Sequence, residues 1–117
     1  MLIVEDNIDG AMSLVMLVKQ MGHQVEYVVS GDAAVVAARR IRPDTVFLDI
    51  GLPGEMDGFE VAKQLRADFG GAIRIIAITA YGTEAERQRG IEAGIDLHLL
   101  KPARTELLES LLGLNSS

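Results

Sequence analysis

Three acidic side chains that could bind a cation or attack an electrophile directly follow short apolar runs of this chain. Glu5 and Asp6 come after Leu2–Val4, and Asp49 ends the apolar run that begins at Val46. Carboxylates gathered at one place raise one another's pKa unless a cation lies between them. Because these ligands are all oxygen, a hard cation such as Mg²⁺ is the ion that we expect at this place.

Two further polar residues end later apolar runs. Thr79 follows Ile73–Ile78, and Lys101 follows Leu97–Leu100. An ammonium beside a metal site suggests an anionic guest that both cations share, and a phosphoryl group suits Mg²⁺, Lys101 and a hydroxyl together. In that chemistry Asp49 would be the nucleophile and would form an acyl phosphate, while Thr79 donates a hydrogen bond to it.

The hydrophobic pattern predicts the elements that must hold these residues. Short apolar runs alternate with longer amphipathic stretches, as in repeated strand–helix units. We expect strands at 2–4, 24–29, 46–49, 73–78 and 97–100, with helices beginning near residues 8, 30, 57, 83 and 105. This order predicts an α/β, flavodoxin-like three-layer sandwich, with a five-stranded parallel sheet of order 2-1-3-4-5 and helices on both faces. The carboxyl ends of the strands then share one edge, where the acids, Thr79 and Lys101 meet.

Composition excludes several classes of function. With 117 residues, 49% of them hydrophobic and 24% charged, the chain is expected to form one domain, residues 1–117. It has no cysteine, so thiolate metal sites and cysteine nucleophiles are excluded. A formal charge of −6 argues against nucleic-acid binding by this domain. We see no export signal and no apolar run long enough to span a membrane, so we expect a cytoplasmic location and no membrane contact by this domain.

Five motifs, in the same order along essentially the whole chain, resemble those of the CheY-like response-regulator receiver domains of two-component signalling. They are Leu-Ile-Val-Glu5-Asp6-Asn7, Phe-Leu-Asp49-Ile-Gly-Leu-Pro, Met56-Asp57-Gly58, Ile-Thr79-Ala80 and Leu-Leu-Lys101-Pro102. The resemblance implies a signalling domain rather than an enzyme with turnover. It also implies that a histidine kinase or a histidine phosphotransfer domain supplies the phosphoryl group.

The resemblance assigns roles to individual residues. Glu5, Asp6, Asp49 and the main-chain carbonyl of Gly51 are expected to bind Mg²⁺, and Asp49 is the expected phosphoacceptor.

Three more positions take roles from the same resemblance. Thr79 and Lys101 are expected to hold the phosphoryl group, and a cis peptide is expected between Lys101 and Pro102. Thr79 and His98 match the family's switch pair, which changes the surface of the fourth helix, fifth strand and fifth helix. A weak homodimer through that surface is a further expectation.

The sequence disfavours several other classes. A haloacid-type phosphatase would place a second aspartate where Gly51 stands, and a dinucleotide or flavin site would not follow its first strand with Glu5 and Asp6, so these three classes are disfavoured. A phosphorylation-independent interaction module is an open alternative. The chain also departs from the family at Gly54-Glu55, which lengthens the loop after Asp49 and could alter metal affinity or donor choice.

The sequence says less about the larger protein to which this domain could belong. Short stretches such as Gly22-His23, Ala80-Tyr81-Gly82 and His98-Leu-Leu-Lys-Pro resemble receivers attached to hybrid sensor histidine kinases or chemotaxis-type fusions. We therefore expect a receiver cut from such a protein, with a stand-alone response regulator as the alternative.

Overall fold

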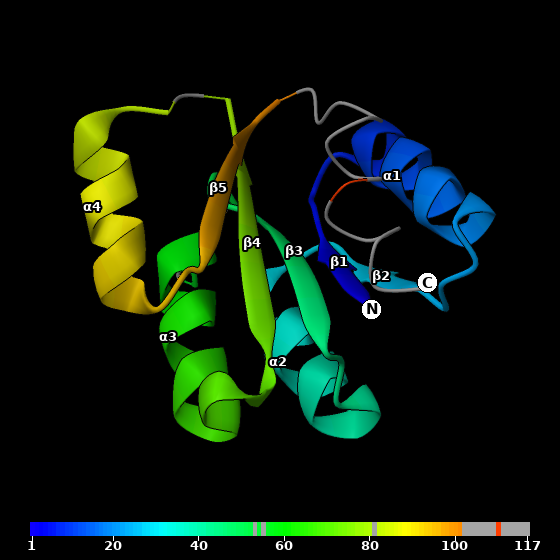
Figure 1. The fold of residues 1–117 in the computed structure, drawn as a ribbon, viewed down its shortest axis with the longest axis horizontal. Coiled ribbons are helices and arrows are strands. Elements are labelled where there is room, and N and C mark those ends of the chain that lie inside the picture. Colours follow the sequence, from blue (N-terminus) through cyan, green and yellow to red (C-terminus); the bar gives the residue numbers. More distant parts are fainter. Residues whose placement is uncertain (53, 55, 81, 102–109, 111–117) are drawn as a thin grey trace.

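A computed structural model describes residues 1–52, 54, 56–80, 82–101 and 110. Five parallel strands form one sheet in the order β2-β1-β3-β4-β5 (Figure 1). The strands are β1 (Leu2–Val4), β2 (Glu26–Val28), β3 (Thr45–Asp49), β4 (Arg74–Thr79) and β5 (Leu97–Leu100). The helices are α1 (Ile8–Gln20), α2 (Gly31–Ile41), α3 (Gly58–Phe69) and α4 (Glu84–Ala93), with a 3-10 turn η1 (Gly70–Ala72). The predicted fold class and strand order are confirmed.

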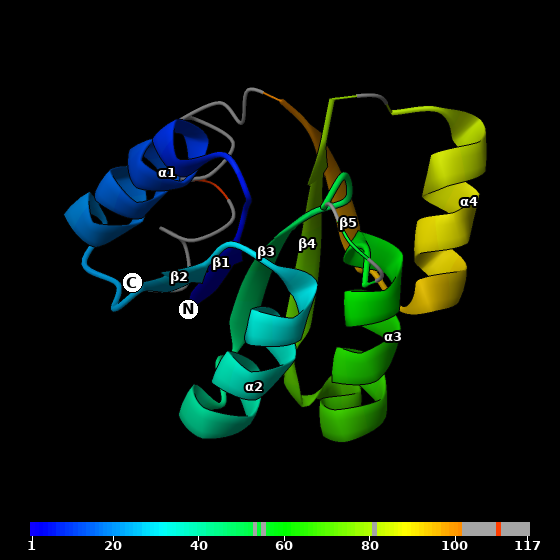
Figure 2. The same ribbon diagram turned by 180° about the vertical axis from the view of Figure 1, so that it is seen from behind.

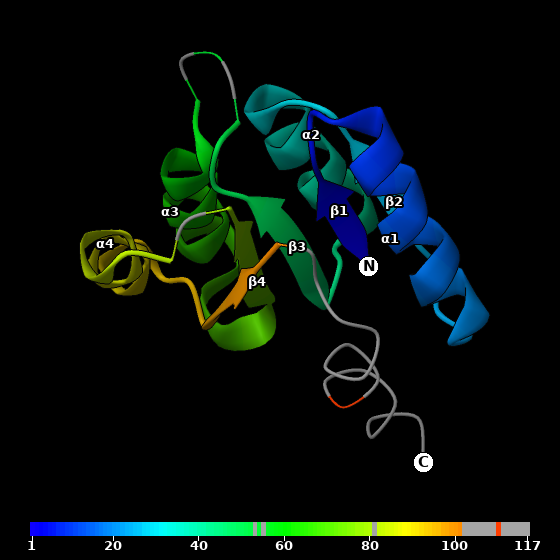
Figure 3. The ribbon, with the colours of Figure 1, turned by 90° about the horizontal axis from the view of Figure 1, so that it is seen from above.

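The alternation of side chains along the strands builds a core on each face of the sheet. One core contains Leu48 of β3 and Leu65 of α3, and the other contains Phe47 of β3 and Val18 of α1. Figure 3 shows α1 on one side of the sheet and α2 and α3 on the other. Figure 2, seen from behind, shows the face of the sheet that α2 and α3 cover. The described helices and strands therefore make the three layers that the pattern predicts.

The helix starts follow the capping residues in the sequence. Asn7, Ser30, Asp57 and Thr83 each accept a hydrogen bond from a backbone N–H in the first turn of the helix that they precede. Because each cap stands shortly after a strand, it turns the chain away from the carboxyl edge of the sheet. The polar residues at the strand ends are thus left at that edge.

The predicted strand boundaries need correction by one or two residues, and some other expectations concern residues outside those described. The second strand is Glu26–Val28 rather than 24–29, because β1 offers only Leu2–Val4 as its pairing partner. Arg42, in the left-handed conformation with φ 48°, ends α2 one residue before Pro43. The expected last helix, Glu55 and the Lys101–Pro102 peptide involve residues outside those described. Among the described residues, no helix combines the length and the apolar character needed to cross a membrane.

Candidate functional site

A lysine bridges two carboxylates at the carboxyl edge of the sheet. The Nζ atom of Lys101 lies 3.1 Å from Oε2 of Glu5 and 3.2 Å from Oδ2 of Asp49. Glu5 follows β1, Asp49 ends β3 and Lys101 follows β5, so the contact joins segments far apart in the sequence. The parallel sheet places them together because β1 and β5 flank the pair β3 and β4.

Asp49 is held in a defined orientation. Its side chain is buried, and its Oδ1 accepts a hydrogen bond of 2.9 Å from the N–H of Gly51. Its Oδ2 accepts the bond from Lys101. Gly58 packs against the backbone here, since a Cβ at that position would lie 2.6 Å from the carbonyl oxygen of Asp49. The start of α3 therefore supports the turn that follows β3.

The three acids form a set suited to a cation. One carboxylate oxygen from each of Glu5, Asp6 and Asp49 lies within 4.8 Å of the others. Glu5 and Asp49 are buried, whereas Asp6 is exposed. Burial and the neighbouring Asp49 carboxylate raise the pKa of Glu5, and the Asn7 N–H and Lys101 only partly offset this. Crowded oxygen ligands of this kind fit a hard divalent ion such as Mg²⁺.

Lys101 carries its positive charge in this environment. Burial alone would lower the pKa of its ammonium, but the hydrogen bond to Glu5 and the charges of Asp49 and Glu5 outweigh burial and raise that pKa. The side chain is 36% exposed, so solvent and a guest group can both reach it. An anion placed between Lys101 and a cation on the acids would find positive charge on two sides.

Thr79 ends β4 at the same edge and is buried. Its hydroxyl donates a hydrogen bond of 2.9 Å to Oε1 of Glu86, in the first turn of α4. The sheet therefore brings Thr79 to the edge where it was predicted, while this bond directs its hydroxyl toward α4. Glu86 is not among the residues predicted for the site, and the structure adds it through this contact.

His98 lies on β5, paired with Ala77 of β4. Its half-buried ring packs on Gly90 of α4, because a Cβ at residue 90 would lie 2.3 Å from Cε1 and Nε2 of the ring. Burial lowers the pKa of His98, the charge of Arg87 acts in the same direction, and Glu86 opposes them. Among the described residues, Nε2 has no hydrogen-bond partner. The predicted switch residues Thr79 and His98 thus both contact α4.

The geometry agrees with most of the predicted site. Glu5, Asp6, Asp49 and Lys101 are brought together, and Gly51, two residues after Asp49, donates its N–H to the Asp49 carboxylate. The role of the Gly51 carbonyl and all residue-by-residue functions stay predictions. Glu86 is a further residue at this edge, and the sequence carries no signal that separates it from Glu84 in the same first turn of α4.

Comparisons with known proteins agree on one family. The sequence model of the response regulator receiver domain matches residues 1–112. The DNA-binding response regulator MtrA of Mycobacterium tuberculosis is 35% identical over 107 residues, which are 92% of this chain and 46% of that protein. The chain therefore spans about half the length of the curated relatives that it matches.

Solved structures give the same result. The chemotaxis protein CheY4 of Vibrio cholerae superposes with a TM-score of 0.87 at 28% identity, covering 94% of this chain and 92% of that chain. The receiver domain of a sensor histidine kinase of Pseudomonas aeruginosa, which has a magnesium ion in its active-site cleft, gives a TM-score of 0.85 at 32% identity, covering 97% and 93%. Receiver domains of this kind are signalling domains that interact with histidine kinases. With its fold, acidic edge and matched sequence, this chain belongs to the response-regulator receiver domain family.

Proposed function

We propose that Asp49 accepts a phosphoryl group from a phosphohistidine of a histidine kinase or a histidine phosphotransfer domain. The observation that carries this assignment is the position of Lys101, whose Nζ lies within 3.2 Å of Asp49 and 3.1 Å of Glu5 at the carboxyl edge. A structural lysine could pair with one acid. A lysine held between the candidate nucleophile and a metal-binding acid is placed to share a bound anion.

The reaction follows from the groups at this edge. A carboxylate oxygen of Asp49 attacks phosphorus, the P–N bond of the donor breaks, and the imidazole leaves with the electron pair. The Gly51 N–H and Lys101 orient the carboxylate beforehand. Lys101 then neutralises part of the charge on the phosphoryl oxygens, and the Thr79 hydroxyl can donate to one of them once it leaves Glu86.

Glu5, Asp6 and Asp49, with the Gly51 carbonyl, would hold Mg²⁺. When bound, Mg²⁺ supplies positive charge that offsets the repulsion between these acids and the incoming phosphate. The clustering of the three carboxylates supports this assignment. The magnesium ion in the related Pseudomonas receiver domain supports it as well.

The output surface that we propose is formed by α4, β5 and the expected last helix. Within its described part the apolar side chains of Ile91, Leu97 and Leu100 are exposed, which suits a partner or a weak homodimer. The relatives named as DNA-binding regulators support a parent protein with an output domain, and the Pseudomonas receiver supports a hybrid kinase. In either parent, we place residues 1–117 as a cytoplasmic receiver domain.

Intact mass spectrometry tests the proposal. The protein is incubated with Mg²⁺ and acetyl phosphate, and we expect one added phosphate on the wild type and none on Asp49→Asn. This substitution keeps the shape of the side chain and removes the nucleophilic charge. Asp44→Asn, at an exposed acid before β3, is the matched control and should be phosphorylated like the wild type.

The same experiment identifies the competing class. A wild-type protein that takes no phosphate from acetyl phosphate or from a phosphorylated histidine phosphotransfer domain would contradict the proposal. That result would favour a phosphorylation-independent interaction module.

A further inference from the structure

Glu86 contacts the site although neither the metal nor the phosphoryl chemistry uses it. Its Oε1 accepts the 2.9 Å hydrogen bond from Oγ1 of Thr79. Thr79 is buried at 5% exposure, and Glu86 is half-buried in a turn whose other members, Glu84 and Ala85, are exposed. The carboxylate of Glu86 therefore points from the helix toward the end of β4 rather than into solvent.

Helix capping alone does not explain this orientation. Oγ1 of Thr83 accepts the N–H of Glu86 at 3.1 Å, which is the first half of a capping box. In the second half, the glutamate side chain would return to the N–H of the cap residue. Here Oε1 of Glu86 instead binds a hydroxyl seven residues back along the chain. The contact joins α4 to the sheet edge.

The chemistry of a hydroxyl makes this contact a competitor of phosphorylation. A threonine hydroxyl has one proton to donate. While that proton is given to Glu86, it is not available to a phosphoryl oxygen on Asp49. The carboxylate of Glu86 and the phosphoryl oxygen are both charged acceptors. Charge alone therefore does not decide which of them the hydroxyl binds.

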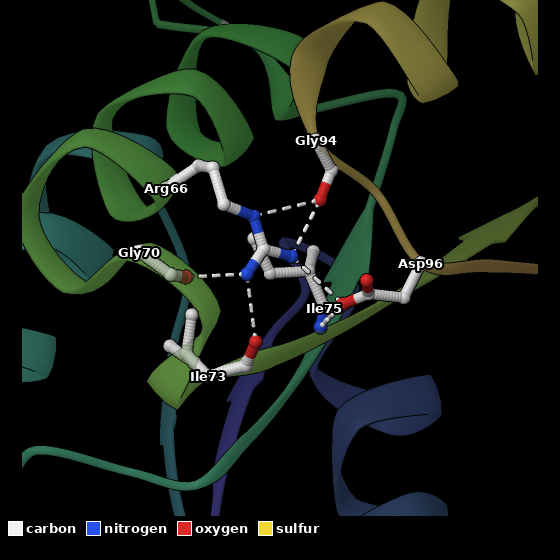
Figure 4. A network of polar contacts seen from close by, with 6 residues as sticks. All are labelled: Arg66, Gly70, Ile73, Ile75, Gly94 and Asp96. Atoms are coloured by element: carbon white, nitrogen blue, oxygen red, sulfur yellow. Dashed lines mark hydrogen bonds and ion pairs between the residues drawn. The ribbon is translucent and has the colours of Figure 1, made fainter.

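The rest of α4 is fixed elsewhere. At its C-terminal end, the guanidinium of Arg66 donates to the carbonyl of Gly94 and pairs with Asp96 at 2.7 Å (Figure 4). In its middle, Arg89 lies over the ring of Phe59 at 4.2 Å from the centroid. Among the described residues, the bond between Thr79 and Glu86 joins the first turn of α4 to the end of β4.

We infer that Glu86 is a positioning residue that holds the Thr79 hydroxyl toward α4 in the unphosphorylated state. Phosphorylation of Asp49 draws the hydroxyl away, breaks this bond and releases the first turn of α4. The free energy of the hydrogen bond to Glu86 is lost when Thr79 binds the phosphoryl group, so this bond lowers the affinity of the site for that group. This inference rests on the proposed function, because it requires a phosphoryl group on Asp49.

Titration with Mg²⁺ and beryllium trifluoride, a phosphoryl mimic that binds aspartate, tests the inference by NMR. Glu86→Ala should bind the mimic about fivefold more tightly than the wild type, which corresponds to one net hydrogen bond. Glu86→Gln keeps an oxygen acceptor and should lie between the two. Glu84→Ala removes the same charge from the same turn without touching Thr79, and should change the affinity much less.

A double substitution separates the hydrogen bond from general electrostatics. In a Thr79→Val background there is no hydroxyl to release, so adding Glu86→Ala should leave the affinity unchanged. An equal gain with and without the hydroxyl, or a wild-type affinity for Glu86→Ala, would overturn the inference while the proposed function stands. A wild type that does not bind the mimic at all would overturn both. Amide exchange in the first turn of α4 should be faster in Glu86→Ala, as a readout without any ligand.

Discussion

Two neighbouring helices on the same face of the sheet, α3 and α4, are held by different forces. Both begin with a side-chain cap, from Asp57 in α3 and Thr83 in α4. α3 buries Phe59, Val61, Ala62 and Leu65 against the strands, whereas the buried residues of α4 are Gly90 and Ala93. Apolar burial fixes a helix in one place, while a few polar contacts can be exchanged for others. α3 is thus suited to support Asp49, and α4 is suited to change its position.

The largest expected effect breaks the packing of α3. Leu65 is fully buried, so Leu65→Ala leaves a cavity and should lower the free energy of unfolding by about 2–5 kcal/mol. The matched substitution in α4 is Ile91→Ala, at a side chain that is 63% exposed, and it should change stability by less than about 0.5 kcal/mol. Urea unfolding of both variants measures the contrast. Similar losses in the two helices would contradict the comparison.

A smaller effect is expected where one residue joins the two helices. Arg66 of α3 donates to the carbonyls of Gly70, Ile73 and Gly94 and pairs with Asp96 (Figure 4). Arg66→Met keeps the apolar part of the side chain and leaves these acceptors without their donor. Because the site is partly exposed, water replaces some of the bonds, and we expect a loss of about 1–3 kcal/mol.

The control for this prediction is an ion pair on the surface. Arg39 binds Asp68 at 3.0 Å with its own side chain 57% exposed, so Arg39→Met should cost at most about 1 kcal/mol. Hydrogen exchange adds a positional test. Arg66→Met should speed exchange at the C-terminal end of α4 more than in the first turn of α3, and uniform exchange would argue against an anchor at this point.

The same contrast explains what could be predicted from the sequence. The strand order and the meeting of Glu5, Asp49 and Lys101 follow from apolar runs that end in polar residues, because parallel strands share a carboxyl edge. These features depend on the backbone and on hydrophobic pattern. They are insensitive to the rotamer of any one side chain.

The contacts of α4 could not be predicted in this way. The bonds from Thr79 to Glu86 and from Arg66 to Gly94 depend on side-chain rotamers and on how α4 lies against its neighbours. By helix propensity alone, Gly90 weakens α4 by roughly 1 kcal/mol relative to alanine. In the structure it also provides the space for the ring of His98, and no local propensity encodes that packing.

The smallest expected change in stability sharpens the comparison at this glycine. Gly90→Ala gains helix propensity of about 1 kcal/mol but displaces the His98 ring, so its net effect on stability at pH 7.5 should be within about 1 kcal/mol. The ring should move into solvent, and its pKa should rise toward the ordinary value of 6.5.

In the wild type the lowered pKa of His98 means that, as the pH falls, the unfolded chain binds a proton at this residue before the folded chain does. Stability from His98 is therefore present above pH 6.5 and falls as the pH drops from 6.5 toward the folded-state pKa. That fall should be smaller in Gly90→Ala and absent in His98→Gln. NMR titration of the ring protons and urea unfolding at pH 7.5 and 5.5 measure both, and an unchanged His98 pKa in Gly90→Ala would show that α4, rather than the ring, yields to the added methyl group.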